Sequence, residues 1–539
     1  MAPGSRAVVL GGSVAGLCAA GAVAPHFDEV VILERDVLPE DAQHRRGVPQ
    51  SKHPHFILNS GRRAINELFP GFEDDLIAAG GKLLMPSYDA AYLEQPGWAP
   101  RKKSTMTMLY TSRILIERVL RDKVRALSNV RIDEGVAVQG LQEEAGAIVG
   151  VTFQREDSDP EMLAADLVVD AMGRGSSVGD WLARTGWPEP PVKTLDAKVT
   201  YVSRWYDLPS AEERPKAWWW QHIVIMPAQG EDPSRPAEHA YLSNFFPIDG
   251  DRVIACMGSW GLDMPKSVDD FTTAAKRLRT PVFADAMEVC EPTSEVHLTR
   301  STGNKWRRYD QVSSAPAGLV FLGDSICAFN PFYAQGMSAA SASAVLLKAT
   351  LAEGIGSDLA RRFTKAQVDI LKVPWGLAMA RDGGFEFATG TEKPAEWRRR
   401  LIAKLGDPIF NAITGAARED SVIDEHFAKV FNLDESFGDM FKSPRVLWGL
   451  LRYQAKSALR RTVVPYGFDA SADPPGTDYT DFEKTRQLPV GEPVRASPAT
   501  MRPRPSPATS ASPATTSTRS SASTTRPICT AGRRSRWNC

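Results

Sequence analysis

A strand, a tight turn and a helix near the N-terminus place the strongest constraint on how this chain folds. The stretch reads VVLGGSVAGL from Val8 to Leu17, with three apolar residues running into glycines. Gly11 and Gly16 occupy the outer positions of the pattern G-x-G-x-x-G, and Ser13 stands at the middle one. Serine is small enough for the backbone to approach a pyrophosphate, and its hydroxyl could donate to a phosphate. The stretch therefore predicts a helix whose N-terminus faces the phosphates of a nucleotide.

The residues after the turn complete a βαβ unit. Val14–Ala22 has the small residues of a closely packed helix, and Val30–Leu33 predicts a second buried strand. Glu34 follows 23 residues after Gly11, where an acid accepts hydrogen bonds from ribose hydroxyls and disfavours a 2′-phosphate. A glycine-rich turn can occur without any bound nucleotide. The strand, turn, helix, second strand and acid together predict a dinucleotide site. FAD and NAD both fit it.

Composition and cysteine usage narrow the class of protein. The chain has 539 residues, 43% of them hydrophobic, which is enough for a large core. No stretch approaches the ~18 consecutive apolar residues of a membrane-spanning helix, so no integral membrane segment is expected. The start of the chain lacks the pattern of a secretory signal. The six scattered cysteines contain no C-x-x-C pair and suit reduced thiols, so we expect a cytoplasmic protein.

Charge is distributed unevenly along the chain. Of its 64 Lys and Arg residues, eight arginines lie in 495–539, a segment without Asp, Glu or Lys. Residues 1–494 therefore carry 56 basic residues against 65 acidic ones. This acidic body argues against nucleic acid as a partner. The last residues are almost only Ser, Thr, Pro, Ala and Arg, which predicts a disordered tail over 476–539.

A second strand–turn–helix, far downstream, distinguishes between the two nucleotides. Leu319–Ser338 reads LVFLGDSICAFNPFYAQGMS, in which an apolar strand ends at Gly323 and Asp324, a proline loop follows, and Gly336 opens a helix. This segment resembles the flavoprotein monooxygenases of the p-hydroxybenzoate hydroxylase kind. The resemblance implies that Asp324 binds the ribityl chain of FAD, that Pro331 flanks the isoalloxazine ring, and that Gly336 and Met337 face its O2/N1 edge. A helix N-terminus there stabilises negative charge on reduced flavin.

This sequence departs from the family pattern at three positions of the same segment. Cys327 stands where a histidine is common, Asn330 replaces a first proline, and Ala334 replaces a glycine. These departures leave the flavin contacts in place and affect the shape of the pocket.

Two further segments are similar to the same family. Asp166–Ser176 reads DLVVDAMGRGS, with the Asp-x-x-Gly-x-x-Ser core at Asp170, Gly173 and Ser176. Arg45–Gln50 reads RRGVPQ and is followed by His53, His55 and, later, Arg113. The pattern is most similar to bacterial epoxidases and hydroxylases of secondary metabolism, including polyether epoxidases, and covers about residues 7–460. The predicted cofactor-binding residues are Gly11, Gly12, Ser13, Val14, Ala15, Gly16, Glu34, Arg35, Arg46, Gln50, Arg113, Ala137, Asp170, Gly173, Gly323, Asp324, Pro331, Gly336 and Met337.

The predicted architecture is α/β. A Rossmann-like FAD-binding domain of the p-hydroxybenzoate hydroxylase type would span 1–197 and 301–355, interrupted by a β-sheet substrate domain at 198–300. A helical region would follow at 356–475, and the tail at 476–539.

Aromatic residues of the inserted region are the candidates for a substrate pocket. Trp218, Trp219 and Trp220 are adjacent, and neighbouring side chains on a strand point to opposite faces. We therefore expect one indole in the core and another in the pocket. The run is comparable with the W-x-W-x-I-P of flavin halogenases, but no proline follows Ile223. The predicted pocket residues are Trp218, Trp220, His222, Phe246, Phe329, Phe332 and Tyr333.

No catalytic side chain and no metal site are expected. His53 and His55 have no third ligand nearby in the sequence. The resemblance implies that reduced FAD takes up O2 as a C4a-hydroperoxide and transfers one oxygen atom to a largely apolar polyene, terpenoid or aromatic molecule, by epoxidation or hydroxylation. NAD(P)H would be the reductant; since no separate nicotinamide fingerprint is visible, a partner flavin reductase is an alternative. The alternatives are a flavin reductase, a halogenase, a non-redox cyclase that contains FAD, and a binding protein that keeps flavin only structurally.

Overall fold

The computed structural model describes residues 4–94, 97–99, 101–102, 106–228, 230–299, 302–460 and 474. The chain divides into two units, Met1–Leu488 and Pro489–Cys539, and every described residue belongs to the first. The tail predicted over 476–539 lies outside the described residues.

Five parallel strands form the central sheet, in the order β20-β11-β1-β2-β7. They are β1 (Gly4–Leu10), β2 (Phe27–Leu33), β7 (Val130–Asp133), β11 (Leu167–Asp170) and β20 (Leu319–Phe321). Leu10 stands opposite both Leu33 and Asp170, so the carboxyl ends of these strands meet at one edge. Their almost continuous apolar sequences fit a sheet that is covered on both faces. The predicted α/β class is confirmed.

Alternating residues of β1 belong to two different apolar clusters. Ala7 and Val9 pack with the helices α1 (Val14–Val23), α2 (Asn59–Leu68), α5 (Arg113–Arg125) and α9 (Gly336–Glu353). Val8 and Leu10 pack on the other face, as the two-residue period of a strand requires. An added Cβ on Gly61 of α2 would lie 2.5 Å from the Oγ atom of Ser338 in α9. Only glycine allows these two helices to approach so closely.

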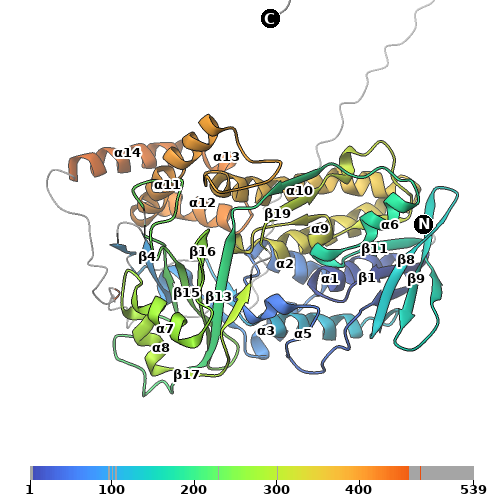
Figure 1. Ribbon diagram of the computed structural model, residues 1–539, viewed down its shortest axis with the longest axis horizontal. Helices are drawn as coiled ribbons and strands as arrows, with labels where there is room; N and C mark the ends of the chain where they lie inside the picture. Colours follow the sequence, from blue (N-terminus) through green and yellow to red (C-terminus); the bar gives the residue numbers. More distant parts are fainter. Residues whose placement is uncertain are drawn as a thin grey trace, which may run out of the picture. The chain divides into compact units, whose positions relative to one another are not determined.

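A small antiparallel sheet and a long helix cover the second face. The sheet contains β8 (Val136–Glu144), β9 (Ala147–Arg155) and β10 (Glu161–Ala164), and the helix is α10 (Leu359–Asp382). Figure 1 shows α10 running beside α9 and the short strand β19 (Asn304–Arg307). Shorter elements complete this part: α3 (Phe72–Ala78), α4 (Pro86–Asp89), α6 (Val178–Arg184), the paired strands β3 (Lys82–Leu84) and β6 (Met108–Tyr110), and the sheet of β12 (Val192–Leu195), β19 (Asn304–Arg307) and β21 (Cys327–Ala328).

An eight-stranded mixed sheet forms the inserted region. Its path is β17-β13-β16-β15-β14-β4-β5, with β18 paired to β13. Two of its strands, β4 (Ala90–Glu94) and β5 (Gly97–Trp98), come from well before residue 198, a contribution that the sequence did not predict. The others are β13 (Val199–Asp207), β14 (His222–Ile225), β15 (Leu242–Ile248), β16 (Arg252–Trp260), β17 (Glu291–Pro292) and β18 (His297–Thr299). The helices α7 (Val268–Lys276) and α8 (Val282–Val289) pack on this sheet through Phe245 and Phe283.

Four helices follow α10: α11 (Glu396–Glu419), α12 (Ser421–Phe431), α13 (Phe437–Met440) and α14 (Pro444–Arg460). They lie together above the strands β4 and β16 in Figure 1 and share an apolar cluster around Ile423. Asn432, which follows α12, connects these helices to α2: its side-chain oxygen accepts a hydrogen bond from the Asn59 N–H at 2.9 Å. Within the described part of the chain, no helix combines the length and the apolar character needed to cross a bilayer.

Candidate functional site

The glycine-rich turn joins β1 to α1 with no room for side chains at its outer positions. Gly11 has a φ of +100°, and an added Cβ there would lie 2.9 Å from the Ala171 carbonyl oxygen. An added Cβ on Gly16 would overlap the carbonyl oxygen of Gly11. Both glycines are therefore required by backbone packing, which is the steric reason for the fingerprint.

Glu34 is hydrogen-bonded to the backbone of the glycine-rich turn. Its carboxylate is buried and accepts hydrogen bonds from the Gly12 N–H at 2.7 Å and the Asp36 N–H at 2.9 Å. The Arg45 guanidinium lies 3.2 Å from Oε1 of Glu34, the oxygen that also accepts from the Asp36 N–H. Glu34 does not line the cavity described below. In this conformation its oxygens hold the turn together.

A buried ionic cluster surrounds Ser13. The Arg113 guanidinium donates to Ser13 Oγ at 2.7 Å, and Ser13 Oγ donates to Glu117 at 3.1 Å. Glu117 also pairs with Arg113 at 2.9 Å and with Arg45 at 2.6 Å. Burial acts to raise the pKa of Glu117, but the two guanidiniums outweigh it and hold that pKa below its ordinary value. The hydroxyl that the sequence offered to a phosphate is thus engaged by two protein side chains.

Two guanidinium nitrogens of this cluster, Arg45 Nη2 and Arg113 Nη1, have no hydrogen-bond partner among the described residues, and the second belongs to a residue of the cavity wall. Arg113 is buried and lines the cavity, and no residue in the described ranges accepts from its Nη1 atom. A buried guanidinium donor beside a helix N-terminus is a position that suits an anionic group. The cluster therefore fits the phosphates of a dinucleotide.

The second predicted turn lies against the first. Gly323 has a φ of +71°, and an added Cβ would lie 2.7 Å from the Cβ of Ala15. Asp324 faces the cavity; burial raises the pKa of its carboxyl group, and Arg174, with Nε 3.8 Å away, opposes that rise. The helix α9 begins shortly afterwards at Gly336, with its N-terminus at the same cavity.

Asp170 supports both turns from the end of β11. Its carboxylate accepts from Ser176 Oγ at 2.6 Å and from the Met172 N–H at 3.1 Å. Burial raises the pKa of Asp170 to about 6 despite these hydrogen bonds. The backbone carbonyl of Asp170 accepts from Ser325 Oγ at 2.7 Å, which links the segment to the Gly323-Asp324 turn.

These turns open into one cavity of about 1350 Å³. That volume exceeds the roughly 300–1,000 Å³ of a typical small-molecule site, so it has room for a cofactor and a second ligand. The predicted cofactor residues that line it are Ser13, Val14, Ala15, Arg35, Arg46, Gln50, Arg113, Gly173, Gly323, Asp324, Pro331, Gly336 and Met337. Gly11, Gly12, Gly16, Glu34 and Asp170 lie behind this lining. Ala137 lies on β8 and is not part of it.

The predicted substrate residues separate into two groups. His222, Phe329, Phe332 and Tyr333 line the cavity. Trp218, Trp220 and Phe246 do not, which corrects the prediction made for them. The ring centroids of Trp218 and Trp220 are 4.7 Å apart, and both rings pack on Phe245 in the core under α7 and α8. Phe246 is enclosed by Phe56 and Tyr110.

The tryptophan prediction failed because its premise of a strand was wrong. Trp218–Trp220 lie in a loop before β14, so the alternation of strand faces does not apply to them. Trp219 is half-buried, and its ring lies 4.6 Å from the guanidinium carbon of Arg101.

Asp382, at the end of α10, accepts hydrogen bonds from four side chains. The sequence did not predict this role. The buried carboxylate accepts from Trp260 Nε1 at 3.0 Å, Asn304 Nδ2 at 2.8 Å, Asn330 Nδ2 at 3.0 Å and Tyr333 Oη at 2.8 Å. Burial raises its pKa, and these donors oppose the rise. A single acid in a helical segment gives no signal in a sequence, since its partners come from three distant segments.

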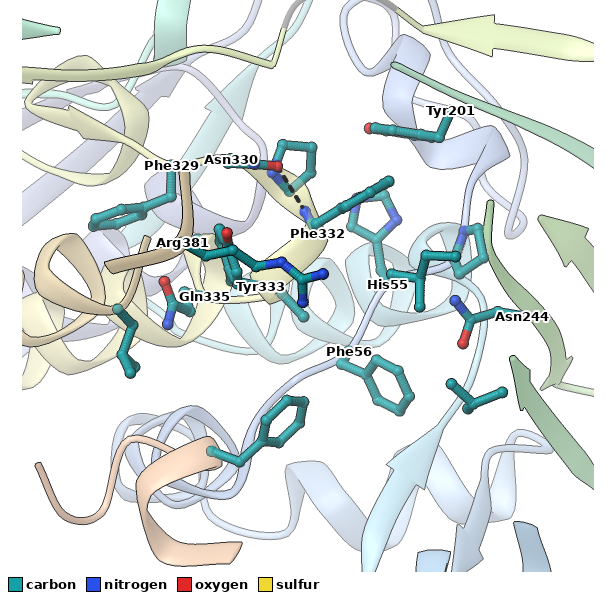
Figure 2. A pocket seen from close by; sticks show the side chains of 18 of the residues that line it. His55, Phe56, Tyr201, Asn244, Phe329, Asn330, Phe332, Tyr333, Gln335 and Arg381 are labelled. Atoms are coloured by element: carbon teal, nitrogen blue, oxygen red, sulfur yellow. Dashed lines mark hydrogen bonds between the residues drawn. The ribbon is translucent and has the colours of Figure 1, made fainter. Parts of the chain in front are cut away.

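The donors on Asp382 fix the loop that carries Pro331. Figure 2 shows Asn330, Phe332, Tyr333, Gln335 and Arg381 gathered around this loop, with His55, Phe56 and Asn244 across the cavity. Asn330 Oδ1 also accepts from the Phe332 N–H at 3.1 Å. The asparagine that departs from the family pattern thus stiffens the loop itself.

Histidines on the cavity wall are held neutral by burial. The pKa of His53 falls to about 3, that of His55 to about 4 and that of His222 to about 3. His222 contacts Tyr110 Oη through Nδ1 at 3.2 Å and Asn244 Oδ1 through Nε2 at 3.3 Å. No group of three metal-ligating side chains occurs among the residues that the structure describes.

These depressed pKa values predict acid lability. Below pH 6.5 the unfolded chain protonates His55 while the folded chain does not until about pH 4, so stability is full above pH 6.5 and falls as the pH drops. His55→Asn should reduce the loss of unfolding free energy between pH 7 and pH 5 by about 2 kcal/mol. Urea denaturation at both pH values measures this; an equal loss in both proteins contradicts it.

Comparison with known sequences finds two curated relatives of this chain. The chain is 30% identical over 447 residues to Protein Rv3254 of Mycobacterium tuberculosis (strain ATCC 25618 / H37Rv), which covers 80% of this chain and 90% of that protein. It is 25% identical over 360 residues to squalene epoxidase 4 of Arabidopsis thaliana, and spans 61% of that protein's length. No protein-family model matches the chain.

Solved structures share its fold. The flavin-dependent brominase Bmp2 superposes with a TM-score of 0.55 at 14% identity, covering 85% of this chain and 100% of Bmp2. PqsL of Pseudomonas aeruginosa, described as a probable FAD-dependent monooxygenase, superposes with a TM-score of 0.53 at 16% identity, covering 75% of this chain and 99% of PqsL. The fold predicted by resemblance is confirmed. The chain belongs to the family of Protein Rv3254, and its fold is that of the FAD-dependent monooxygenases.

Proposed function

We propose that this protein is an FAD-dependent monooxygenase that inserts one oxygen atom from O2 into a largely apolar small molecule. The observation that carries the proposal is the cavity: the two glycine turns and the start of α9 form one end of it, and aromatic and aliphatic residues form the other. FAD, when bound, would supply the oxygen chemistry. The squalene epoxidase among the similar sequences supports an epoxidation, and hydroxylation is the alternative outcome.

Residues of this chain would hold the cofactor in two places. The N–H groups at the start of α1 and the free Nη1 of Arg113 would bind the phosphates, and Arg46 and Gln50 line the same end. Asp324 would bind the ribityl chain, and the loop of Pro331 would lie against the ring. The N-terminus of α9 would stabilise negative charge there.

The other end of the cavity would position substrate and exclude water. Phe56, Phe332 and Met108 line it beside Tyr201 and Trp260. Polar groups that could orient a substituent also line the cavity, among them Asn244 and the neutral imidazoles of His53 and His222. An apolar, closed site protects a reactive oxygen donor from water. No side chain of the chain is assigned as a nucleophile or a base.

NAD(P)H would reduce the flavin, either directly or through a separate flavin reductase. We place the protein in the cytoplasm, where NAD(P)H is supplied. The four cysteines in the described ranges are buried free thiols, which supports a reducing compartment.

An oxygen-incorporation assay tests this function. Purified protein should be yellow or bind added FAD, and should consume O2 with NADH or NADPH, with or without an added flavin reductase, when polyene or aromatic candidates are present. Mass spectrometry should find one ¹⁸O atom from ¹⁸O2 in the product. Because Bmp2 shares the fold, bromide is included, and a brominated product would favour halogenation. Protein that cannot be loaded with FAD, or bound flavin that neither NADH nor NADPH bleaches with or without an added flavin reductase, rules out the monooxygenase.

Substitution at Ser13 tests the cofactor end separately. Ser13→Gly should retain FAD, because glycine satisfies the backbone requirement of the fingerprint. Ser13→Leu should weaken FAD binding at least about a hundredfold (roughly 3 kcal/mol), since a branched side chain would displace Arg113 from the turn. Fluorescence titration of the apoprotein measures both; equal affinities would show that the cofactor lies elsewhere.

A further inference from the structure

Exposed apolar side chains are concentrated on the last helices. Among the described residues, nine of the fourteen large apolar side chains that are exposed lie between residues 397 and 459. Trp397 is 71% exposed and Trp448 is 69% exposed. Large exposed apolar clusters mark interaction surfaces, whereas scattered single residues do not.

Most of these exposed apolar side chains lie along one side of α11 or one side of α14. Trp397, Leu401, Leu405 and Ile409 recur every four residues and so follow one side of α11. Leu447, Trp448, Leu451 and Leu459 give α14 a second exposed apolar face. The two helices pack together, because an added Cβ on Gly415 of α11 would overlap the Tyr453 side chain of α14. We call these two sides the α11–α14 face.

Basic residues accompany the α11–α14 face. Residues 444–460 contain four Lys and Arg residues and no Asp or Glu. Arg445 and Arg452 are exposed on α14, and Arg398, Arg400 and Lys404 are exposed on α11, where Arg400 forms an ion pair with the exposed Glu396. An amphipathic helix with tryptophan and leucine beside arginine and lysine is typical of a segment that lies in the interface of an anionic bilayer.

The cavity provides an independent observation that points to a lipid phase. Ile409 is 49% exposed and Phe431 is 47% exposed, yet both also line the cavity, together with Ile402 and Phe410. One end of the apolar cavity is therefore bounded by the helix whose outer side is the apolar stripe. A molecule dissolved in a bilayer would meet the protein at this end.

We propose that the α11–α14 face docks on an anionic phospholipid bilayer, with its apolar side chains at the level of the headgroups and its arginines against lipid phosphates. The helices lie on the surface and do not cross it. The proposal concerns docking alone and does not depend on which reaction the protein catalyses. If the proposed oxygenation is correct, docking places the cavity next to a source of apolar substrate.

Charge favours a bilayer over a second copy as the occupant. A symmetric dimer would bring the same face of both copies together. Two α14 helices without a single acid would then oppose each other, and like charges brought together at an interface are unfavourable. Anionic headgroups instead complement the face.

Vesicle co-sedimentation of the full chain tests the proposal. Wild-type protein should bind vesicles of phosphatidylcholine with phosphatidylglycerol more tightly than vesicles of phosphatidylcholine alone. Trp397→Ser combined with Leu401→Ser, Trp448→Ser and Leu451→Ser should reduce binding at least tenfold. Removing Arg398, Arg400, Arg445 and Arg452 as glutamines should weaken it about fivefold for each charge lost. Val37→Ser with Met162→Ser is the matched control, because these two side chains are exposed elsewhere and should not matter.

Three outcomes would overturn the proposal. The arginines of 495–539 are present in every variant, so unchanged binding in both helix variants would assign binding to that segment. Wild-type protein that ignores anionic vesicles also excludes docking. Light scattering that shows a dimer lost in the serine variant would make the face a self-association surface. Quenching of wild-type tryptophan fluorescence by brominated lipid tests the same contact without any substitution, should a variant fail to fold.

Discussion

Replacing Gly16 by alanine should destabilise the nucleotide-binding region by about 3 kcal/mol, the upper end of the usual cost of overpacking. The new Cβ would overlap the Gly11 carbonyl oxygen, which is backbone and cannot rotate away. Helix α1 would have to move off β1, and the turn that would hold the phosphates would open. We expect reduced expression, a lower midpoint of denaturation and loss of bound FAD together, measured by urea unfolding and by flavin content.

Gly376→Ala is the matched control. Gly376 also lies inside a helix, α10, but it is exposed, and nothing lies within 4 Å of an added Cβ. Alanine there should be neutral or stabilise by up to about 1 kcal/mol through helix propensity. If Gly16→Ala behaves like Gly376→Ala, the close contact between strand and helix does not exist.

Replacing Glu117 by alanine should cost about 3–5 kcal/mol of stability. Glu117 is the shared acid of Arg45 and Arg113, and all three side chains are less than 10% exposed. Its removal takes away the acid that pairs with the buried Arg113 guanidinium. Arg45 keeps Glu34 at 3.2 Å and Asp36 at 2.8 Å, so the cost comes mainly from Arg113. The substitution also frees Ser13 from its acceptor, so FAD affinity should change along with stability.

A solvent-exposed ion pair on the same helix provides the control for the Glu117→Ala substitution. Arg118 and Asp122 are 2.8 Å apart on α5, with side chains 33% and 48% exposed. Asp122→Ala should cost no more than about 1 kcal/mol, because water already solvates both charges. Thermal and urea denaturation of both variants, in low and high salt, separate the two cases. Equal costs would mean that the cluster around Ser13 is solvated and not buried.

Several features of this site could be predicted from the sequence because they are local. The spacing of Gly11 and Gly16 follows from what one turn between a strand and a helix allows. Gly323 and Asp324 predict a second such turn at the end of another strand. The resemblance then joined the two turns, and the parallel register of β1, β11 and β20 explains why they meet at one edge.

Other features depend on partners that no local pattern specifies. Asp382 acquires its role from Trp260, Asn304 and Tyr333, which lie on three other segments. The pocket prediction for the tryptophan run was wrong for the same reason. The position of each ring depends on the conformation of the loop before β14 and on the helices α7 and α8 that pack over it. The strands β4 and β5 join a sheet formed mostly by residues more than a hundred positions later.

The sequence by itself therefore determined the class of fold, the two turns and the acidic residues that end their strands, because steric limits and apolar periodicity act over a few residues. Only the tertiary structure decided that Ser13 lies within an ionic cluster, that Asp382 fixes the Pro331 loop, and that α11 both lines one end of the cavity and carries an exposed apolar stripe. Those outcomes are set by burial and charge pairing between segments far apart in the chain, and neither quantity exists until the chain has folded.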